Sequence, residues 1–318
     1  MNKKDRVLAA ISHQQVDHVP ASFSLHFPRE IASGEAAVKA HIDFYRETDC
    51  DVLKIMNENL VPEIGEMNGP DDWKKIPAYN RHSPFMVRQL DMIKRILDGV
   101  GEPVYALATV HGICASAIHP IEERYGYVPV REMMAAHLRQ NKTVVLDAFH
   151  RIADAMSDLA AACIEAGSSG IYYAALGGEK HFYTDEEFAE AIEPFDRQIL
   201  SAAREAGGHT FLHICKENLE MSRYAGYGDL CDVVNWGVYE APYTLEEGRR
   251  LFPRATIMGG LANRSGVLVD GTDDELKAAV QAVIRDFGET GFILGADCTL
   301  PTEIPYGRIM AAVHAAVK

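Results

Sequence analysis

Three residues whose side chains bind metals end two apolar runs of the sequence. The run HTFLHIC (209–215) places His213 and Cys215 two residues apart, so in a strand both side chains point to the same face. Cys298 ends the later run GFILGADC (291–298). Imidazole and thiolate groups are preferred ligands of zinc, and three protein ligands with a fourth position open are typical of a catalytic zinc.

The same residues also fit an ordinary protein core. Cysteine is among the most buried residue types and often behaves as a small hydrophobe. A His-x-Cys pair with one distant cysteine also occurs in many sequences by chance. Residue types and spacing therefore leave a metal site and a core cluster open, and the elements that carry His213, Cys215 and Cys298 must decide between them.

Short apolar runs recur along the chain, and helical patterns separate them. Each run is rich in β-branched residues and bounded by Gly, Asp or Asn, which is typical of buried parallel strands. The clearest helix is expected over 272–287, where Leu276, Val280, Val283 and Phe287 follow three- and four-residue spacing. The runs cover 19–27, 51–56, 104–110, 170–176, 209–215, 232–239, 255–261 and 291–298.

Three helix starts carry the same signal. TDEE (184–187), TLEE (244–247) and TDDE (272–275) each place a threonine three residues before a glutamate, which is the pattern of a capping box. Each follows a candidate strand, so strand and helix alternate. About eight such units predict one α/β domain over residues 1–318, a (β/α)8 TIM-type barrel. A doubly wound open sheet is the alternative, but no G-x-G-x-x-G turn follows an early strand.

In a barrel, the carboxyl ends of the strands form one mouth, where active sites gather. His213 and Cys215 end the fifth expected strand, Cys298 ends the eighth, and Glu240 follows the sixth. This placement favours a metal centre with Glu240 as a further candidate ligand. The stretch 57–100 predicts a long loop over one end of the barrel, and long loops of this kind are often lids.

Other histidines and cysteines have less distinctive positions. We expect His26 and His111 to line a substrate pocket, since they end the first and third strands, although His26 also fits an ordinary surface or capping histidine and His111 also fits the core. Cys114 follows the third strand and is expected in the pocket wall or the core. The remaining cysteines are expected to be packing residues: Cys50, Cys163 and Cys231.

Charge and composition exclude several classes of partner. A formal net charge of −15 disfavours nucleic acid, because an acidic surface repels phosphate. No apolar run approaches the ~20 residues that cross a bilayer, and the opening MNKKDRVLAA lacks the apolar core of a signal peptide. The six cysteines are dispersed, so reduced thiols are expected. We expect a cytoplasmic protein with neither a membrane nor a nucleic-acid partner.

Three segments together resemble the uroporphyrinogen decarboxylase superfamily. They are RVLAAISHQQVDHVP (6–20), CDVLKIMNEN (50–59) and the closing GADCTLPTEIPYGRIMAAVHAAV (295–317). The resemblance spans nearly the whole chain and implies a distorted (β/α)8 barrel, in agreement with the alternation of strands and helices.

The chain departs from the decarboxylases at their working positions. That branch carries an arginine-rich loop after the first strand, whereas HFPRE offers only Arg29. It has an aspartate after the second strand that gathers the pyrrole NH groups, where this chain has Asn57 and Glu58, so the resemblance implies that Asn57 lines the substrate pocket. Its last strand ends in Leu-Gly-His, which is Leu-Gly-Ala at 294–296 here. These differences argue against uroporphyrinogen as the substrate.

The resemblance to the cobalamin-dependent methyltransferase branch, which includes coenzyme M methyltransferases, is closer. Its zinc motif, His-x-Cys followed by a distant cysteine, matches His213, Cys215 and Cys298. Some members use a glutamate after the sixth strand as a fourth ligand, and Glu240 lies about two residues beyond that place. The usual glycine after His-x-Cys is Lys216 here, which could alter the choice of substrate.

The resemblance implies a zinc-dependent methyltransferase that moves a methyl group between a corrinoid and a thiol or similar small acceptor. The sequence has no D-x-H-x-x-G corrinoid-binding motif, so cobalamin is expected to arrive on a separate corrinoid protein. Two alternatives stay open. One is a decarboxylase or lyase acting on a smaller acid, and the other is a non-catalytic corrinoid- or tetrapyrrole-binding protein.

Overall fold

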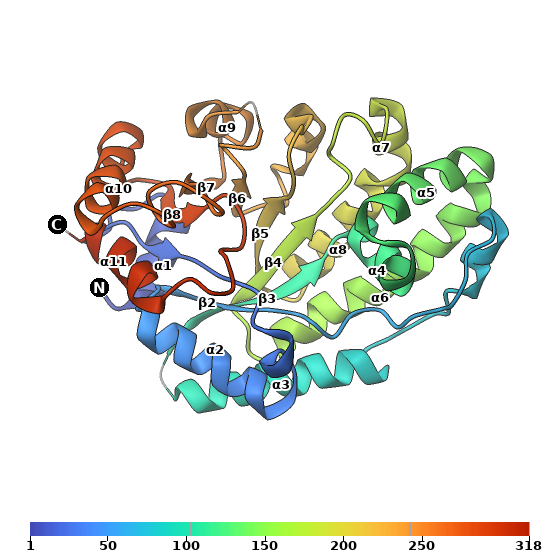
Figure 1. Ribbon diagram of the computed structural model, residues 1–318, viewed down its shortest axis with the longest axis horizontal. Coiled ribbons are helices and arrows are strands. Elements are labelled where there is room, and N and C mark those ends of the chain that lie inside the picture. Colours follow the sequence, from blue (N-terminus) through green and yellow to red (C-terminus); the bar gives the residue numbers. More distant parts are fainter. Residues whose placement is uncertain (102, 242, 318) are drawn as a thin grey trace.

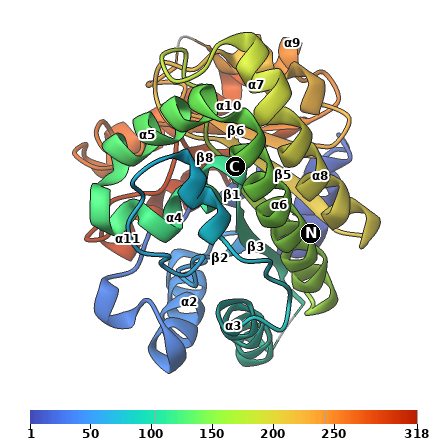
Figure 2. The ribbon, with the colours of Figure 1, turned by 90° about the vertical axis from the view of Figure 1, so that its right-hand side faces the viewer.

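A parallel sheet of eight strands forms the centre of the molecule in the computed structural model, which describes residues 1–101, 103–241 and 243–317. The strands follow the order β1-β8-β7-β6-β5-β4-β3-β2, and Figure 1 shows the part from β8 to β2. Figure 2 shows helices such as α2, α3, α5, α6 and α8 around the strands. The predicted (β/α)8 barrel is therefore confirmed, and the doubly wound sheet is excluded.

Each observed strand falls on a predicted run. Most boundaries differ from the prediction by one or two residues, but the first strand is much shorter, because only two of its residues pair with β8. The strands are β1 (Ala21–Ser22), β2 (Val52–Ile55), β3 (Tyr105–His111), β4 (Gly170–Ala175), β5 (His209–Ile214), β6 (Val233–Trp236), β7 (Thr256–Leu261) and β8 (Phe292–Ala296).

The three predicted capping boxes are confirmed at the starts of α7, α9 and α10. Over the described residues, no helix combines the length and apolar character that a membrane-spanning segment requires. The α-helices are α1 (Lys3–Ile11), α2 (Gly34–Thr48), α3 (Pro84–Val100), α4 (Ile113–Tyr125), α5 (Tyr127–Gln140), α6 (Lys142–Glu165), α7 (Asp185–Ala191), α8 (Glu193–Glu205), α9 (Leu245–Leu251), α10 (Asp273–Phe287) and α11 (Tyr306–Ala315). The described residues also form the 3-10 helices η1 (Arg29–Ile31), η2 (Pro70–Lys75) and η3 (Met221–Tyr227).

The apolar core has two layers, as barrel geometry requires. The larger cluster joins the outward faces of the strands to the helices. The smaller cluster fills the amino-terminal half of the barrel, where α1 packs against the strands. Since α1 closes this end, the open mouth lies at the carboxyl ends of the strands. The smaller cluster comprises Val7, Ala9, Ala10, Val16, Val52, Tyr105, Leu107, Tyr172, Phe211, Val233, Met258 and Ile293.

The barrel closes at a seam between β1 and β2. No strand ladder joins these two strands in the described part of the chain. Asp51 bridges them instead: its backbone N–H donates to the Ala21 carbonyl at 2.9 Å, and its Oδ2 accepts from the Ala21 N–H at 2.8 Å. Arg6 of α1 donates to the other carboxylate oxygen at 2.5 Å. One buried carboxylate thus replaces a strand pair.

The stretch 57–100 needs a correction in its second half. Pro84–Val100 is the helix α3, with Pro84 at the start and Phe85, Ile93 and Ile96 on its buried face. The preceding segment contains η2 and packs against α4, α5 and α6, where the Ile64 N–H donates to the Pro120 carbonyl at 3.1 Å. A lid function for that segment stays a prediction.

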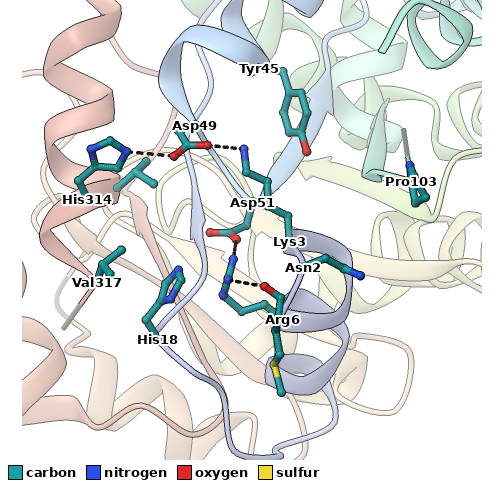
Figure 3. A pocket seen from close by; sticks show the side chains of 12 residues that line it. Asn2, Lys3, Arg6, His18, Tyr45, Asp49, Asp51, Pro103, His314 and Val317 are labelled. Carbon is teal, nitrogen blue, oxygen red and sulfur yellow. Dashed lines mark hydrogen bonds and ion pairs between the residues drawn. The ribbon is translucent and has the colours of Figure 1, made fainter. Parts of the chain in front are cut away.

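A cavity of about 510 Å³ opens at the amino ends of the strands. In Figure 3 the Asp49 carboxylate lies between Lys3 and His314, at 2.6 Å and 3.0 Å, and so ties α1, α2 and α11 together. Arg6 and Asp51 pair beside them. Because its charged groups are already paired and it faces away from the mouth, this cavity is a poor candidate for the reactive site.

Candidate metal centre

The structure brings together the three residues that the sequence placed at strand ends. Single ligand atoms of His213, Cys215 and Cys298 lie within 4.8 Å of one another, and the two Sγ atoms are 3.9 Å apart. His213 belongs to β5, Cys215 follows it directly, and Cys298 follows β8. His213 is buried and both cysteines are half-buried, so the cluster lies at the mouth of the barrel rather than in its core.

One hydrogen bond fixes the tautomer of the His213 imidazole. His213 Nδ1 lies 2.6 Å from Asn235 Oδ1, which can only accept, so Nδ1 carries the proton. In the neutral ring His213 Nε2 keeps its lone pair; this buried nitrogen has no hydrogen-bond partner at normal geometry and lies beside the Cys298 thiol. A buried nitrogen without a partner is costly in a folded protein, and a metal ion satisfies it.

Asn235 is held by a complete set of hydrogen bonds. Its Nδ2 donates to the carbonyls of Met258 at 3.0 Å and Ala296 at 3.1 Å, and the Tyr172 hydroxyl donates to its Oδ1 at 3.0 Å. The amide therefore cannot rotate without losing several bonds. The Tyr172 ring also stacks on the His213 ring, with 5.4 Å between centroids. Sequence reasoning missed both residues, and the only signal was a polar residue within each apolar run.

The contact between the two thiols shifts the pKa values of Cys215 and Cys298 in opposite directions. The hydrogen bond from Cys215, helped by the nearby imidazole, lowers the pKa of Cys298 well below its usual value. The same hydrogen bond and burial raise the pKa of Cys215 well above its usual value. The pair is thus prepared to lose its first proton easily and its second only with help from a cation, which is the behaviour expected of a dithiol metal site.

Glu240 lies near this cluster but outside the group whose ligand atoms share one small volume. The residue is exposed, while partial burial of its carboxylate and then the charge of Cys298 raise its pKa. Asp297, which sequence reasoning did not single out as a ligand, is buried next to Cys298. Its Oδ2 accepts from the Tyr239 N–H at 2.9 Å, and its Oδ1 has no described partner. Metal binding by Glu240 stays a prediction.

The predicted pocket residues occupy different surroundings. His26 is exposed, and its Nδ1 lies 2.7 Å from Glu58 Oε1. Asn57 is buried and accepts from the Asn59 N–H in its own loop at 3.0 Å. Burial lowers the pKa of His111 well below its usual value, and its ring meets His119 edge-on at 4.7 Å. Contact with a substrate stays a prediction for His26, Asn57 and His111.

The other four cysteines are buried and free. This agrees with the packing role expected for Cys50, Cys163 and Cys231, and it places Cys114 in the core or the wall rather than in the metal cluster.

Two lysines lie close to the thiols. Lys216, which follows Cys215, adopts φ 89°, a left-handed conformation that side chains other than glycine adopt at a cost. Its Nζ lies 4.6 Å from the centre of the Tyr127 ring. Lys54 on β2 is buried, with its Nζ 3.4 Å from the centre of the Tyr172 ring. Neither contact could be predicted from the sequence pattern.

The donor set fits zinc. Two thiols that can deprotonate, one neutral imidazole with a free Nε2 and a mouth open to solvent are the features of a catalytic zinc site with an exchangeable position. Any metal would be held by His213, Cys215 and Cys298.

A protein-family model matches most of the chain. The family model described as "Uroporphyrinogen decarboxylase (URO-D)" matches residues 52–318. No curated protein sequence matches the chain.

Solved structures share the fold at low sequence identity. A methyltransferase from Methanosarcina mazei has a TM-score of 0.80 at 17% identity, covering 99% of this chain and 98% of that one. A B12-independent methionine synthase from Shewanella sp. W3-18-1 has a TM-score of 0.60 at 11% identity, covering 94% and 97%. A putative vitamin-B12 independent methionine synthase from Listeria monocytogenes has a TM-score of 0.56 at 16% identity, covering 94% and 95%. These identities support a common fold.

Proposed function

Since the chain belongs to the uroporphyrinogen decarboxylase family, we propose that it is a zinc-dependent methyltransferase acting between a corrinoid and a thiol or similar small acceptor. The observation that carries the proposal is the cluster of His213, Cys215 and Cys298, in which the buried Nε2 of His213 lacks a partner. The fold similarity to the Methanosarcina methyltransferase supports the same assignment. The corrinoid is expected on a separate protein.

Each residue of the centre has a defined role in this proposal. Cys215 and Cys298 would supply two negative charges, and His213 would bind as a neutral imidazole through Nε2, since Asn235 holds its proton on Nδ1. The charges of the three ligands would cancel those of a divalent ion. Bound zinc would hold the sulfur of an acceptor thiol as thiolate, the nucleophilic form, near neutral pH.

The transfer balances without a further reagent. The acceptor sulfur forms the new bond to the methyl carbon, and the bond between the methyl group and its donor breaks with the electron pair left on the donor. The proton of the thiol goes to water. The protein positions the acceptor at the mouth of the barrel, which stays open to a large donor.

A decarboxylase or lyase acting on a smaller acid is the second candidate, because the matching family model is named for a decarboxylase. Arg29 does not form the expected clamp: its side chain is 90% exposed and pairs with Glu123 at 3.6 Å across the surface. A substrate with many carboxylates would therefore lack this arginine clamp, which argues against uroporphyrinogen.

Metal content and methyl transfer together test the proposal. Purified protein should carry about one zinc per chain, and Cys298→Ser should lose both zinc and methyl transfer from a methylated corrinoid protein to a thiol. Cys163→Ser, at a buried packing position, is the matched control and should keep both. Wild-type protein without a stoichiometric metal, or a fully metal-loaded Cys298→Ser, would overturn the proposal.

A further inference from the structure

Lys54 is a buried basic residue inside the barrel, and few groups stabilise its charge. Its side chain is buried, and its ammonium donates to Ser24 Oγ at 3.1 Å and lies over the Tyr172 ring. Within residues 1–101, 103–241 and 243–317, no carboxylate oxygen lies within 4.0 Å of its Nζ. Buried ammonium groups in proteins are normally paired, because desolvation of an isolated charge is costly.

One hydroxyl and one aromatic face replace only part of the hydration that Lys54 has lost. Burial accordingly lowers its pKa to about 8, and the charges of Cys298, Cys215 and then Glu58 act in the opposite direction. The thiol pair is therefore a source of negative charge that this ammonium senses, although it does not form an ion pair with either sulfur.

The aromatic contact connects Lys54 to the candidate metal centre. The Tyr172 ring touches the Lys54 ammonium and also stacks on the His213 imidazole. Lys54 and His213 come from β2 and β5, which lie on opposite sides of β4 in the sheet order. Tyr172 thus contacts both the ammonium and the imidazole, and the described residues show no hydrogen bond from the ammonium to either thiol.

The formal charges of the metal and its three ligands do not balance the charge of Lys54. A divalent ion with two thiolates and a neutral imidazole has no net charge, so it does not neutralise Lys54. A fourth ligand that binds as an anion gives the centre one negative charge. We propose that Lys54 is the buried counter-charge for an anionic fourth ligand at the metal centre.

This inference rests on the proposed function and makes it more specific. The centre should prefer ligands that bind as anions, such as thiolates, over neutral ligands of similar size. Lys54 does not touch the metal or the reacting atoms in this arrangement, so it is a positioning residue that acts through charge. A merely structural lysine would affect anionic and neutral ligands alike.

Ligand binding to protein loaded with Co²⁺ in place of Zn²⁺ separates these effects, because cobalt absorbs in the visible range. The probes are 2-mercaptoethanol, which binds as a thiolate, and imidazole, which binds neutral. In Lys54→Met the Kd for 2-mercaptoethanol should rise by about tenfold or more, as expected for losing one charge at short range in a partly buried site. The Kd for imidazole should change by less than about twofold, because a neutral ligand has no Coulombic contact to lose.

Two variants control the experiment. Lys39→Met removes an exposed lysine and should leave both affinities unchanged. Lys54→Arg keeps the charge and should stay near the wild-type ratio, and Lys54→Gln replaces Lys54→Met if the latter does not fold. Equal changes for the two ligands, or a tenfold loss in Lys54→Arg, would overturn the inference alone. Absence of a cobalt–thiolate absorption band in the wild type would overturn the proposed function and the inference together.

Discussion

Asn235 lies opposite His213 in the pairing of β5 and β6, and its Oδ1 accepts the Nδ1–H of that histidine at 2.6 Å. The contact decides which imidazole nitrogen is available to a metal. Asn235 is in turn fixed by two backbone carbonyls and the Tyr172 hydroxyl, so the tautomer of His213 is built into the sheet rather than chosen by the ion.

Asn235→Ala should weaken zinc binding by about 10- to 100-fold, because His213 loses the partner that sets its tautomer and orientation. Tyr172→Phe removes only one of the bonds to the amide and should cause a much smaller loss. Competition with a chromophoric chelator measures both affinities. Unchanged zinc affinity in Asn235→Ala would show that the imidazole does not depend on this hydrogen bond.

In zinc-free protein, Cys298 should react with iodoacetamide at pH 7 at least about tenfold faster than the buried packing cysteines. The hydrogen bond from Cys215 lowers the pKa of Cys298, whereas burial raises that of Cys50 to about 11 and that of Cys163 to about 12. Mass spectrometry of peptides identifies the labelled site. Cys215→Ala should slow the labelling of Cys298, and zinc should block it in the wild type; labelling that ignores zinc would contradict the assignment.

Because of His41, the free energy of unfolding should fall in acid. Its Nδ1–H donates to the Ala37 carbonyl at 2.7 Å, its Nε2 accepts from the Met56 N–H at 2.9 Å, and burial lowers its pKa from 6.5 to about 4. Because the folded state holds the neutral ring, this stability is complete above pH 6.5 and is lost as pH falls through 6.5 toward 4. The loss is about 3 kcal/mol.

Urea unfolding at pH values from about 7.5 to about 4.5 measures this effect, because this range spans the ordinary histidine pKa of about 6.5. The difference in unfolding free energy between wild type and His41→Gln should be largest at neutral pH and should shrink in acid. His82→Gln, at an exposed position, is the control. A difference that stays constant with pH would exclude His41 as the source.

At position 216, glycine should stabilise the folded protein more than alanine does, which is the reverse of the usual order. Alanine usually stabilises a chain relative to glycine, but at φ 89° the Cβ is strained. Lys216→Ala and Lys216→Gly both lose the contact with Tyr127, so their comparison isolates the backbone. Lys216→Gly should be more stable than Lys216→Ala by about 1 kcal/mol in urea unfolding. The usual order would mean that the backbone relaxes.

Uroporphyrinogen should not be decarboxylated at a useful rate. Arg29 points to the surface and pairs with Glu123, so it cannot hold the carboxylates of this substrate. Buried carboxylates without cationic partners cost several kcal/mol each, by a rough estimate. Chromatography of the porphyrin products, with a true decarboxylase in parallel, tests this, and rapid formation of coproporphyrinogen would contradict it.

Local signals carried the fold prediction. The capping box of Thr272 and Glu275 and the spacing of Leu276 and Val280 were sufficient for α10, because both depend on neighbours in sequence. The helix α3 was also predictable, since Pro84 and the apolar spacing after it carry the same kind of signal. It was missed because the preceding segment is rich in loop-forming residues.

The residues of the candidate metal centre also differ in how far the sequence predicts them. His213, Cys215 and Cys298 were predictable because a barrel brings the carboxyl ends of its strands to one mouth. Asn235 and Lys54 were not, because each acts on a residue from another strand. Only the register and inward direction of the strands determine such pairs, and a polar residue within an apolar run does not reveal its partner.

Strand pairing runs without a break from β2 to β8 and includes the carriers of Lys54, His213 and Asn235. At the seam, β2 meets β8 across the two-residue β1 and the Asp51 bridge. Lys54 therefore lies on a strand at one edge of the seam, and Cys298 follows the strand β8 on the other side of it. A small opening of the seam would move the ammonium away from Cys298, with less change between His213 and Asn235, whose strands pair directly. The barrel wall itself would then set how strongly an anionic ligand is retained.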